Sequence, residues 1–400
     1  MDLPRAVGVT SVAIILFTVL ASFVCILLLR RRSIRCVFPS PFFLRSDDLQ
    51  LCTTTLRVTD GPEIDLAESP ASNKAAVALY PRRFTWPEVV SATCNFSSPV
   101  IGRGGFSTVY LARLPDSSLA AVKLHYSNNS ERLHRAYYDE LDVLLHLEHP
   151  HIVRLLGYCD DKEDQGVLLF EHVPNGTLHE KLHNTESSAN ALSWPRRISI
   201  ACRLAQALDY LHEGSELQIV HGDVKADNIL LDEGLNPKLT DFGCSRMGFS
   251  SAIARPPLAM TGSPGYVDPH YIRTGMVSKK SDVYSFGVLL LELVTGREAF
   301  DLETERKLTI EVGPMLLEAT EERATEIVDP RVAAECDVRE AAAMASLAVL
   351  CLAENPSVRP SMAEVVRALT EQQSSAKRLA VKIMIKQTRE SLINVRNLFF

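Results

Sequence analysis

Four polar side chains at fixed spacing within residues 221–243 form a set that could move a phosphoryl group. The Asp223 carboxylate can accept a proton from a hydroxyl, and the Lys225 ammonium can neutralise a phosphoryl group in transit. Asn228 and Asp241 offer oxygen ligands to a hard divalent cation. Two short apolar runs around a Gly-Leu-Asn-Pro turn lie between them, and this pattern predicts a hairpin that brings Asn228 and Asp241 to one ion.

The segment reads HGDVKADNILLDEGLNPKLTDFG, and it resembles the catalytic segment of plant receptor-like protein kinases, which phosphorylate serine and threonine. The resemblance covers residues 84–372. It implies an α+β fold with a small β-rich lobe over about residues 84–173 and a large helical lobe over about residues 174–372. It also implies protein substrates, ATP as the phosphoryl donor, and Mg²⁺, or alternatively Mn²⁺, as the metal. The implied roles are catalytic base, charge neutraliser and two metal ligands, carried in that order by Asp223, Lys225, Asn228 and Asp241.

The elements that must position these groups lie upstream. Residues 101–110 form a glycine-rich turn between two strand-like runs, where missing side chains let backbone amides lie over phosphates. Residues 120–123 read as a short strand that ends in Lys123, which the resemblance assigns to the α- and β-phosphates. Apolar residues at helical spacing then predict a helix, and we expect its Glu140 to pair with Lys123.

Residues 167–173 resemble the strand and hinge that cover adenine. Phe170 takes the position at the back of the pocket, and the backbone from Glu171 to Val173 is expected to bond to the base. The residues expected around ATP are Ile101, Gly102, Arg103, Gly104, Gly105, Phe106, Ser107, Thr108, Val109, Ala121, Lys123, Glu140, Phe170, Glu171, Val173 and Leu230.

Residues 6–29 form a run of 24 residues without a charge. At helical rise the run spans about 36 Å, enough to cross a hydrocarbon core of about 30 Å with some tilt. The sequence therefore predicts one transmembrane helix after a short extracytoplasmic segment, residues 1–5. Four arginines follow the run against Arg5 before it, so the positive-inside bias puts the rest of the chain in the cytoplasm, with the plasma membrane as the expected location. The rival interpretation, a cleaved signal peptide, requires a shorter apolar region and a small-x-small site.

Composition and charge describe the remaining segments. Residues 30–83 combine scattered prolines, serines and threonines without a sustained period, which predicts a juxtamembrane linker, and residues 373–400 form a basic tail. Residues 1–45 and 373–400 each carry a net charge of +5, so the total of −7 leaves −17 between them. Such a middle segment argues against nucleic acid as a partner, whereas the basic ends suit an anionic membrane surface. The nine cysteines include no Cys-x-x-Cys pair, which favours a reduced chain without a structural metal.

Two other classes of function compete with the enzyme. A pseudokinase-like scaffold would signal by binding a receptor or co-receptor kinase, a partner that the resemblance also implies for an active enzyme. The intact set of Lys123, Asp223, Asn228 and Asp241 weighs against the scaffold. A ligand-sensing receptor would need an extracellular domain, and the predicted topology leaves almost nothing outside.

Three residues depart from the pattern of the family. Gly222 replaces the usual arginine before the catalytic aspartate, so we expect no basic pocket for a phosphate on the activation segment. His270 replaces a glutamate, so we expect the usual ion pair to Arg359 to be absent. Ser107 replaces the third glycine of the glycine-rich turn. None of the three removes a residue expected to act as base or to bind phosphate or metal.

Overall fold

The computed structural model describes residues 81–126, 130–162, 165–183, 191–215, 217–248, 262–317 and 325–370. A six-stranded sheet opens this part of the chain, in the order β1-β5-β6-β4-β3-β2. Its strands pair antiparallel, except for the parallel pair of β1 and β5. The strands are β1 (Arg82–Arg83), β2 (Val100–Arg103), β3 (Ser107–Arg113), β4 (Leu119–Tyr126), β5 (Leu155–Lys162) and β6 (Gln165–Glu171).

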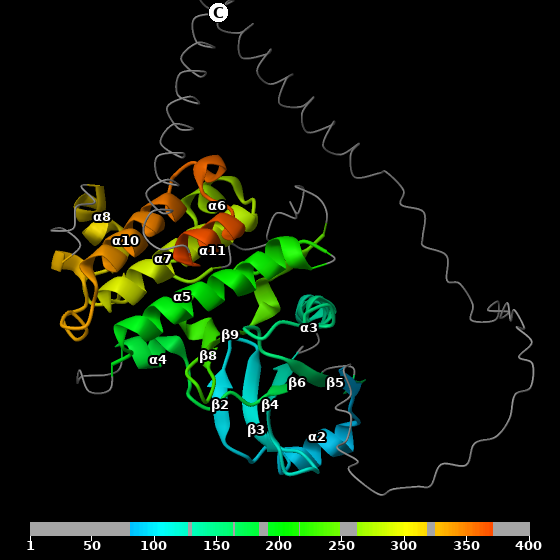
Figure 1. Cartoon of the computed structure of the whole chain (residues 1–400). Coiled ribbons are helices and arrows are strands. Elements are labelled where there is room, and N and C mark those ends of the chain that lie inside the picture. The colour runs from blue at the N-terminus through cyan, green and yellow to red at the C-terminus, as the bar shows by residue number, and fades with distance from the viewer. Residues whose placement is uncertain are drawn as a thin grey trace, which may run out of the picture. The chain divides into compact units, whose positions relative to one another are not determined.

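Side chains of the sheet alternate between two hydrophobic cores, as the pleat of a strand requires. In β6, Leu168 belongs to the larger core, which continues into the helical lobe, and Leu169 belongs to the smaller one. Helix α3 (Glu131–Leu144) packs on the first face and helix α2 (Trp86–Ala92) on the second (Figure 1). The predicted helix after Lys123 is therefore present, and it lies against the face of β4 that carries that lysine.

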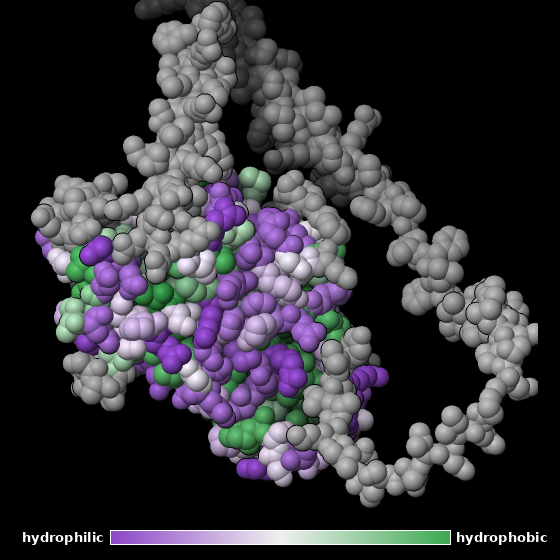
Figure 2. Space-filling model, in the orientation of Figure 1, coloured by the Kyte–Doolittle hydropathy of each residue, from purple (hydrophilic) through white to green (hydrophobic). Residues whose placement is uncertain are grey.

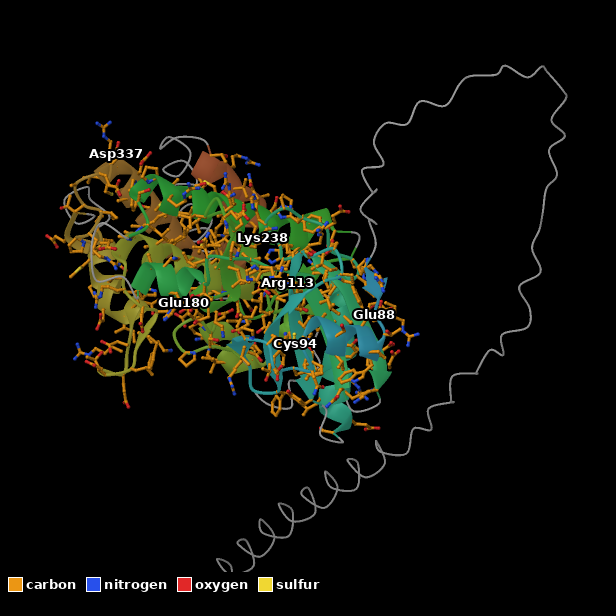
Figure 3. The ribbon with its side chains drawn as sticks, turned by 90° about the horizontal axis from the view of Figure 1, so that it is seen from below. Glu88, Cys94, Arg113, Glu180, Lys238 and Asp337 are labelled. Atoms are coloured by element: carbon orange, nitrogen blue, oxygen red, sulfur yellow. The ribbon has the colours of Figure 1, made fainter. Side chains whose placement is uncertain are left out.

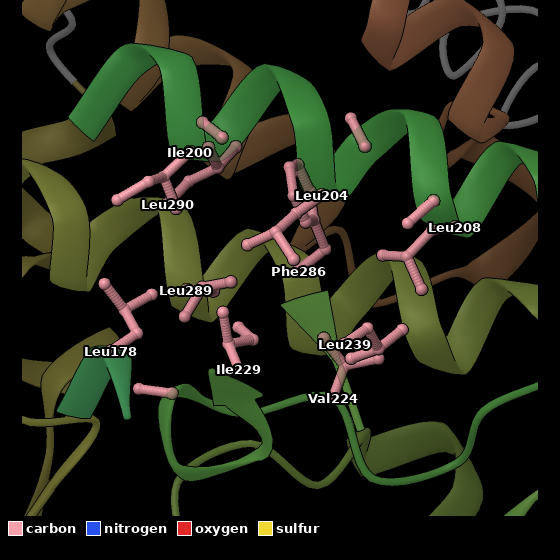
Figure 4. Packing of buried hydrophobic residues seen from close by; sticks show 14 of the residues in the cluster. Leu178, Ile200, Leu204, Leu208, Val224, Ile229, Leu239, Phe286, Leu289 and Leu290 are labelled. Carbon is pink, nitrogen blue, oxygen red and sulfur yellow. The ribbon is translucent and has the colours of Figure 1, made fainter. Parts of the chain in front are cut away.

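The helical lobe is built around α7 (Lys279–Thr295), which is buried along almost its whole length. Figure 4 shows Phe286 and Leu289 of α7 packed between α5 and the segment that holds Ile229 and Leu239. The catalytic segment therefore packs against a buried helix. The helices of the lobe are α4 (Leu178–His183), α5 (Trp194–Asp209), α6 (Pro269–Thr274), α7, α8 (Leu308–Leu317), α10 (Val338–Cys351) and α11 (Met362–Thr370).

Acidic residues in or just before the first turn of several helices accept hydrogen bonds from backbone amides that have no partner within the helix. Glu88 in α2 accepts a hydrogen bond from the backbone nitrogen of Thr85, and Glu180 in α4 accepts one from that of Thr177. Asp337 caps α10 through the backbone nitrogen of Arg339. Glu88, Glu180 and Asp337 are labelled in Figure 3, at three separate places on the domain.

Three two-stranded pairs complete the lobe. The predicted hairpin is present as β8 (Ile229–Leu231) and β9 (Pro237–Leu239). A second pair joins β7 (Ile219–Val220) to β10 (Arg246–Met247), and a third joins β11 (Phe300–Asp301) to β12 (Arg306–Lys307). The first two pairs flank the catalytic residues, so they hold the segment from residue 219 to residue 247 as one unit.

The predicted two-lobed α+β architecture is confirmed. The predicted transmembrane helix, the linker to residue 80 and the tail from residue 373 lie outside the described residues. Within the described ranges, no helix is long and apolar enough to cross a membrane. The described surface visible in Figure 2 is mostly hydrophilic, with hydrophobic residues in separate small areas.

Candidate active site

Asp282, near the start of α7, fixes the backbone of the catalytic segment. Its two carboxylate oxygens accept hydrogen bonds from the backbone nitrogens of His221 and Gly222, each at 2.8 Å. His212 Nε2 lies 2.9 Å from the same carboxylate. Asp282 is 1% exposed, so these hydrogen bonds are shielded from water and hold the residues before Asp223 in one conformation.

Asp223 lies at the centre of a group of polar contacts. Ser263 Oγ donates a hydrogen bond to Asp223 Oδ1 at 2.9 Å, and Lys225 Nζ donates to the same hydroxyl at 2.7 Å. Lys225 Nζ is also 3.1 Å from Asp223 Oδ2. A serine hydroxyl thus already bridges the carboxylate and the ammonium, which shows that this arrangement can hold an alcohol.

Asn228 connects the base to the predicted metal site. Its Nδ2 donates to the Asp223 backbone oxygen at 2.9 Å and to Asp223 Oδ2 at 3.1 Å. The amide oxygen is not used in these bonds and can serve as a metal ligand. The backbone oxygen of Asn228 accepts from Thr240 at 2.9 Å, so the hairpin brings Asn228 close to Asp241.

Lys123 joins the two lobes. Its Nζ lies 2.7 Å from Glu140 Oε1, as predicted, and 2.8 Å from Asp241 Oδ1. Burial alone would lower the pKa of Lys123, but Glu140 and Asp241 together raise it above its ordinary value. Lys123 in turn lowers the pKa of Asp241 to about 2, whereas burial raises the pKa of Glu140 against the opposing effect of Lys123. Lys123 and Asp241 are therefore both charged at neutral pH.

Asp241 has a backbone conformation that few side chains adopt. Its φ of 64° and ψ of 74° lie in the left-handed region, which costs of order 1–3 kcal/mol for a residue other than glycine. The tertiary contacts around Lys123 hold it there. Such strain is characteristic of functional positions, and here it turns the carboxylate toward Lys123.

Five of the residues expected around ATP lie on one face of the sheet. In register, Gly102 pairs with Val109, Val109 with Lys123, and Ala121 with Phe170. Cross-strand partners point to the same face, so this set faces α3 and the helical lobe. The turn of Gly104, Gly105 and Phe106 closes between β2 and β3. Its Gly104 nitrogen donates to the oxygen of Ser107 at 2.8 Å, so serine is compatible with the turn.

Three residues of the expected set have side chains elsewhere. Arg103 and Thr108 are cross-strand partners, each one residue away from the pair of Gly102 and Val109. Their side chains therefore point to the opposite face, and only their backbone can approach a nucleotide. Glu171 Oε1 accepts hydrogen bonds from the Arg154 nitrogen at 2.9 Å and from Lys238 Nζ at 2.7 Å. A hinge role for Glu171 therefore rests on its backbone.

The other expected residues keep positions along the same elements. Ile101 follows the first residue of β2 and is 46% exposed, and Phe106 is 62% exposed at the tip of the turn. Val173 follows β6, and Leu230 lies in the middle of β8. Both are partly buried against the larger core. The sheet and the hairpin thus supply two sides of the candidate nucleotide site.

Arg359 has a carboxylate partner although His270 replaces the glutamate of the family. Arg359 Nη1 and Nη2 each lie 2.8 Å from a different carboxylate oxygen of Asp268, in a fully buried bidentate ion pair. Asp268 also caps α6 through the His270 nitrogen at 2.8 Å. An acidic residue two positions earlier in the chain thus takes over from the missing glutamate, although its side chain is one methylene shorter.

The donor set fits a hard divalent cation. Asn228 supplies an amide oxygen and Asp241 a charged carboxylate, and oxygen ligands of this kind suit Mg²⁺ better than a soft metal. Across the described residues, no group of three or more His, Cys, Asp and Glu side chains could hold a metal alone. The cation would therefore need the phosphates of a nucleotide to complete its ligand shell, which is how Mg²⁺ is commonly held.

Some contacts of the site escaped the sequence analysis. His125 Nε2 lies 3.5 Å from Glu140 Oε2, and burial followed by the charge of Lys123 lowers the pKa of His125 to about 3. The sequence did contain a signal for this contact: His125 follows Lys123 by two residues in the same strand, which places both side chains on one face. The link from Lys123 to Asp241 has no such signal, since the two residues are 118 positions apart.

Comparison with known proteins agrees with this geometry. The protein kinase domain family matches residues 97–369. The chain is 56% identical to a salt tolerance receptor-like cytoplasmic kinase of Oryza sativa subsp. japonica over 77% of this chain and 85% of that protein. It is 42% identical to a probable receptor-like protein kinase of Arabidopsis thaliana over 77% of this chain and 92% of that protein. A longer probable leucine-rich-repeat receptor-like serine/threonine-protein kinase of Arabidopsis thaliana is 40% identical over 76% of this chain and 34% of that protein. The chain therefore belongs to the protein kinase family, as a plant receptor-like serine/threonine protein kinase.

Proposed function

We propose that the chain transfers the γ-phosphoryl group of Mg-ATP to serine and threonine hydroxyls of protein substrates, with Asp223 as the base. The observation that carries the proposal is the position of the Ser263 hydroxyl, 2.9 Å from Asp223 and 2.7 Å from Lys225. Asp223 can take the proton of a substrate hydroxyl held beside it, and Lys225 neutralises charge on the group in transit.

The remaining residues bind and orient the donor. Lys123 holds the α- and β-phosphates, and Glu140 keeps its ammonium in place. Asn228 and Asp241 would hold the cation, which supplies neutralisation of the charge on the phosphate oxygens when it is bound. The backbone amides of residues 102–107 cover the phosphates, and the backbone from Glu171 to Val173 binds the adenine ring of ATP. The roles together require the two lobes to meet, and the contact between Lys123 and Asp241 brings them together.

The test is phosphoryl transfer by the full-length chain. With Mg-ATP labelled in the γ-position, wild type should label seryl and threonyl peptides but not tyrosyl ones, and Asp223→Asn should lower the rate by at least about 100-fold. Asp227→Asn is the matched control, because Asp227 is exposed in the same loop and is expected to leave the rate unchanged. Equal transfer by wild type and Asp223→Asn would refute the role of Asp223. Nucleotide binding without any transfer would favour the scaffold.

We also propose that the chain is anchored in the plasma membrane by residues 6–29, with the kinase domain in the cytoplasm beside a receptor or co-receptor kinase. The support is the uncharged run and the arginines at 30, 31, 32 and 35 after it. Sealed vesicles with the cytoplasmic face outward test the topology. A C-terminal tag should be digested by added protease without detergent, and a protected or secreted tag would overturn the proposal.

A further inference from the structure

The nucleotide face of the sheet presents its side chains in successive rows, because β2, β3 and β4 lie side by side in register (Figure 1). In the first row, Leu111 of β3 lies opposite Ala121 of β4, and Ala121 pairs in turn with Phe170 before the hinge. The next row on the same face, two residues along each strand, pairs Val109 with Lys123. The rows therefore run from the adenine end of the candidate site toward its phosphate end.

Ser107 belongs to the third row. It pairs with His125, two residues beyond the row of Lys123, so it lies about 7 Å farther along the strands. The His125 ring is turned toward α3, where it packs against Tyr137, and its Nε2 lies 3.5 Å from Glu140 Oε2. The Ser107 side chain is therefore the member of this row that can face the end of a bound nucleotide.

The Ser107 hydroxyl lies against the glycine-rich turn, in space that a side chain at Gly104 would fill. A Cβ at Gly104 would lie 2.8 Å from Ser107 Oγ. The backbone nitrogen of Gly104 donates to the Ser107 oxygen at 2.8 Å, so the turn keeps the two residues opposite each other. Ser107 is partly buried, and its Oγ makes no hydrogen bond within the described part of the chain. Its proton is therefore available to a ligand on this face.

We propose that the Ser107 hydroxyl binds the terminal phosphate of ATP, so that the site discriminates between the triphosphate and the diphosphate. Lys123 in the second row is assigned to the α- and β-phosphates, which leaves the third row beside the γ-phosphate. A hydroxyl that donates to a charged phosphate oxygen forms a charge-assisted hydrogen bond, which is stronger than one between neutral groups. The glycine that usually occupies this position has no side-chain donor. This role rests on the position of ATP in the proposed function, and it adds a group that binds the phosphate to be transferred.

Equilibrium binding to the full-length chain tests this role. The probes are the Mg²⁺ complexes of ADP and of β,γ-imido-ATP, a triphosphate analogue whose terminal group is not transferred. Ser107→Ala should weaken binding of the triphosphate by about tenfold and leave the Kd of ADP within about twofold of wild type. Ser107→Thr keeps a hydroxyl in a β-branched side chain that suits a strand, so its triphosphate Kd should stay within about threefold of wild type. Ser118→Ala is the matched control, because Ser118 is an exposed serine in the turn at the other end of β3 and bonds to Asp116.

Ser107→Gly separates the effect of the hydroxyl from that of a stiffer turn. If only the Cβ mattered, Ser107→Ala would bind the triphosphate like wild type and Ser107→Gly would not, and that outcome would overturn the proposed role. Equal losses of affinity for ADP and the triphosphate would overturn it as well. The stoichiometry of binding reports the folded fraction, so a loss of fold is not mistaken for a loss of affinity.

The proposed transfer and the role of Ser107 fail in different ways. A wild-type chain that transfers phosphate, beside a Ser107→Ala variant with unchanged affinity for both nucleotides, would refute the role of Ser107 alone. A selective loss of triphosphate affinity in Ser107→Ala, in a chain that transfers no phosphate, would support the role and refute the transfer. A wild-type chain that binds neither nucleotide would refute both.

Discussion

Lys123 of the sheet lobe lies 2.8 Å from Asp241 of the helical lobe, and the same ammonium lies 2.7 Å from Glu140. Two acidic side chains and one ammonium therefore share one partly enclosed place between the lobes. The ammonium is the only one of the three that can bind phosphate directly, and Asp241 is the one that can bind a cation. We therefore expect phosphate binding at Lys123 and cation binding at Asp241 to be coupled.

Lys123→Met should abolish transfer and also lower stability. The loss of a charge aimed at phosphate costs about 100- to 1,000-fold in rate. Glu140, which is 2% exposed, would be left buried without its cation at a cost of about 3–5 kcal/mol in the free energy of unfolding. Urea denaturation beside the transfer assay measures both. The double variant with Glu140→Gln should recover stability but no activity, and transfer at the wild-type rate by either variant would contradict the role of Lys123.

His125 makes stability depend on pH below neutrality. The folded protein keeps His125 neutral, because burial and Lys123 lower its pKa from 6.5 to about 3. The unfolded chain binds a proton below pH 6.5, so the free energy of unfolding falls as pH falls from about 6.5 toward about 3, by up to about 1.4 kcal/mol per pH unit. Glu140, Lys123 and Asp241 are the charged groups that face this ring or act on it.

The measurement is urea denaturation of wild type and His125→Gln at pH 6.5, 5.5 and 4.5. Wild type should lose more stability than the variant across this window. His134→Gln, at an exposed position of α3, controls for the loss of a histidine in general. Parallel stability curves for wild type and His125→Gln would show that His125 is not held neutral.

The sequence predicts the contacts that are local or that follow from strand and helix periodicity. The hairpin between Asn228 and Asp241 is of this kind, since turn residues specify it. For the pair of Lys123 with Glu140, apolar spacing predicts the helix, and the resemblance implies the pairing. The alternation of side chains along a strand also predicts that Arg103 and Thr108 point away from the face that carries Val109. Assigning every residue of the glycine-rich turn to the ATP site overlooks this alternation. The partner of Arg359 is not predicted in this way. Substitution of one glutamate does not reveal that Asp268, 91 residues away from Arg359, reaches the same guanidinium.

Asp268→Asn should destabilise the helical lobe. The variant leaves Arg359 buried without a counter-charge, at a cost of about 3–5 kcal/mol in the free energy of unfolding. His270→Asn is the comparison, because His270 is only partly buried and its backbone nitrogen, which donates to Asp268, is kept. Differential scanning calorimetry of the two variants checks this. A melting temperature for Asp268→Asn equal to that of wild type would show that the buried pair contributes little.

Control of the enzyme should not depend on a phosphate on the activation segment. Gly222 has a φ of +82°, and a Cβ there would lie 2.8 Å from the Cys244 oxygen, so this position suits glycine and provides no cation. Arg246, one candidate to replace that cation, donates to the backbone oxygens of Cys244 and Ser245. Ser245 itself is buried, and its hydroxyl donates to the Phe242 oxygen, so it is not available for modification.

Ser250, Ser251 and Thr261 are the other candidate phosphorylation sites of the activation segment, and they lie outside the described residues. A phosphate without a buried cationic partner is a solvated charge of small effect. Alanine at all three positions should therefore change transfer to a seryl peptide by less than about threefold, or about 0.7 kcal/mol in barrier. Ser263→Ala is the positive control, because its hydroxyl contacts Asp223 and Lys225 and its loss should impair transfer directly. A loss of about 100-fold or more in the triple variant, reversed by aspartate at the same positions, would mean that another cation has taken the place of the missing arginine.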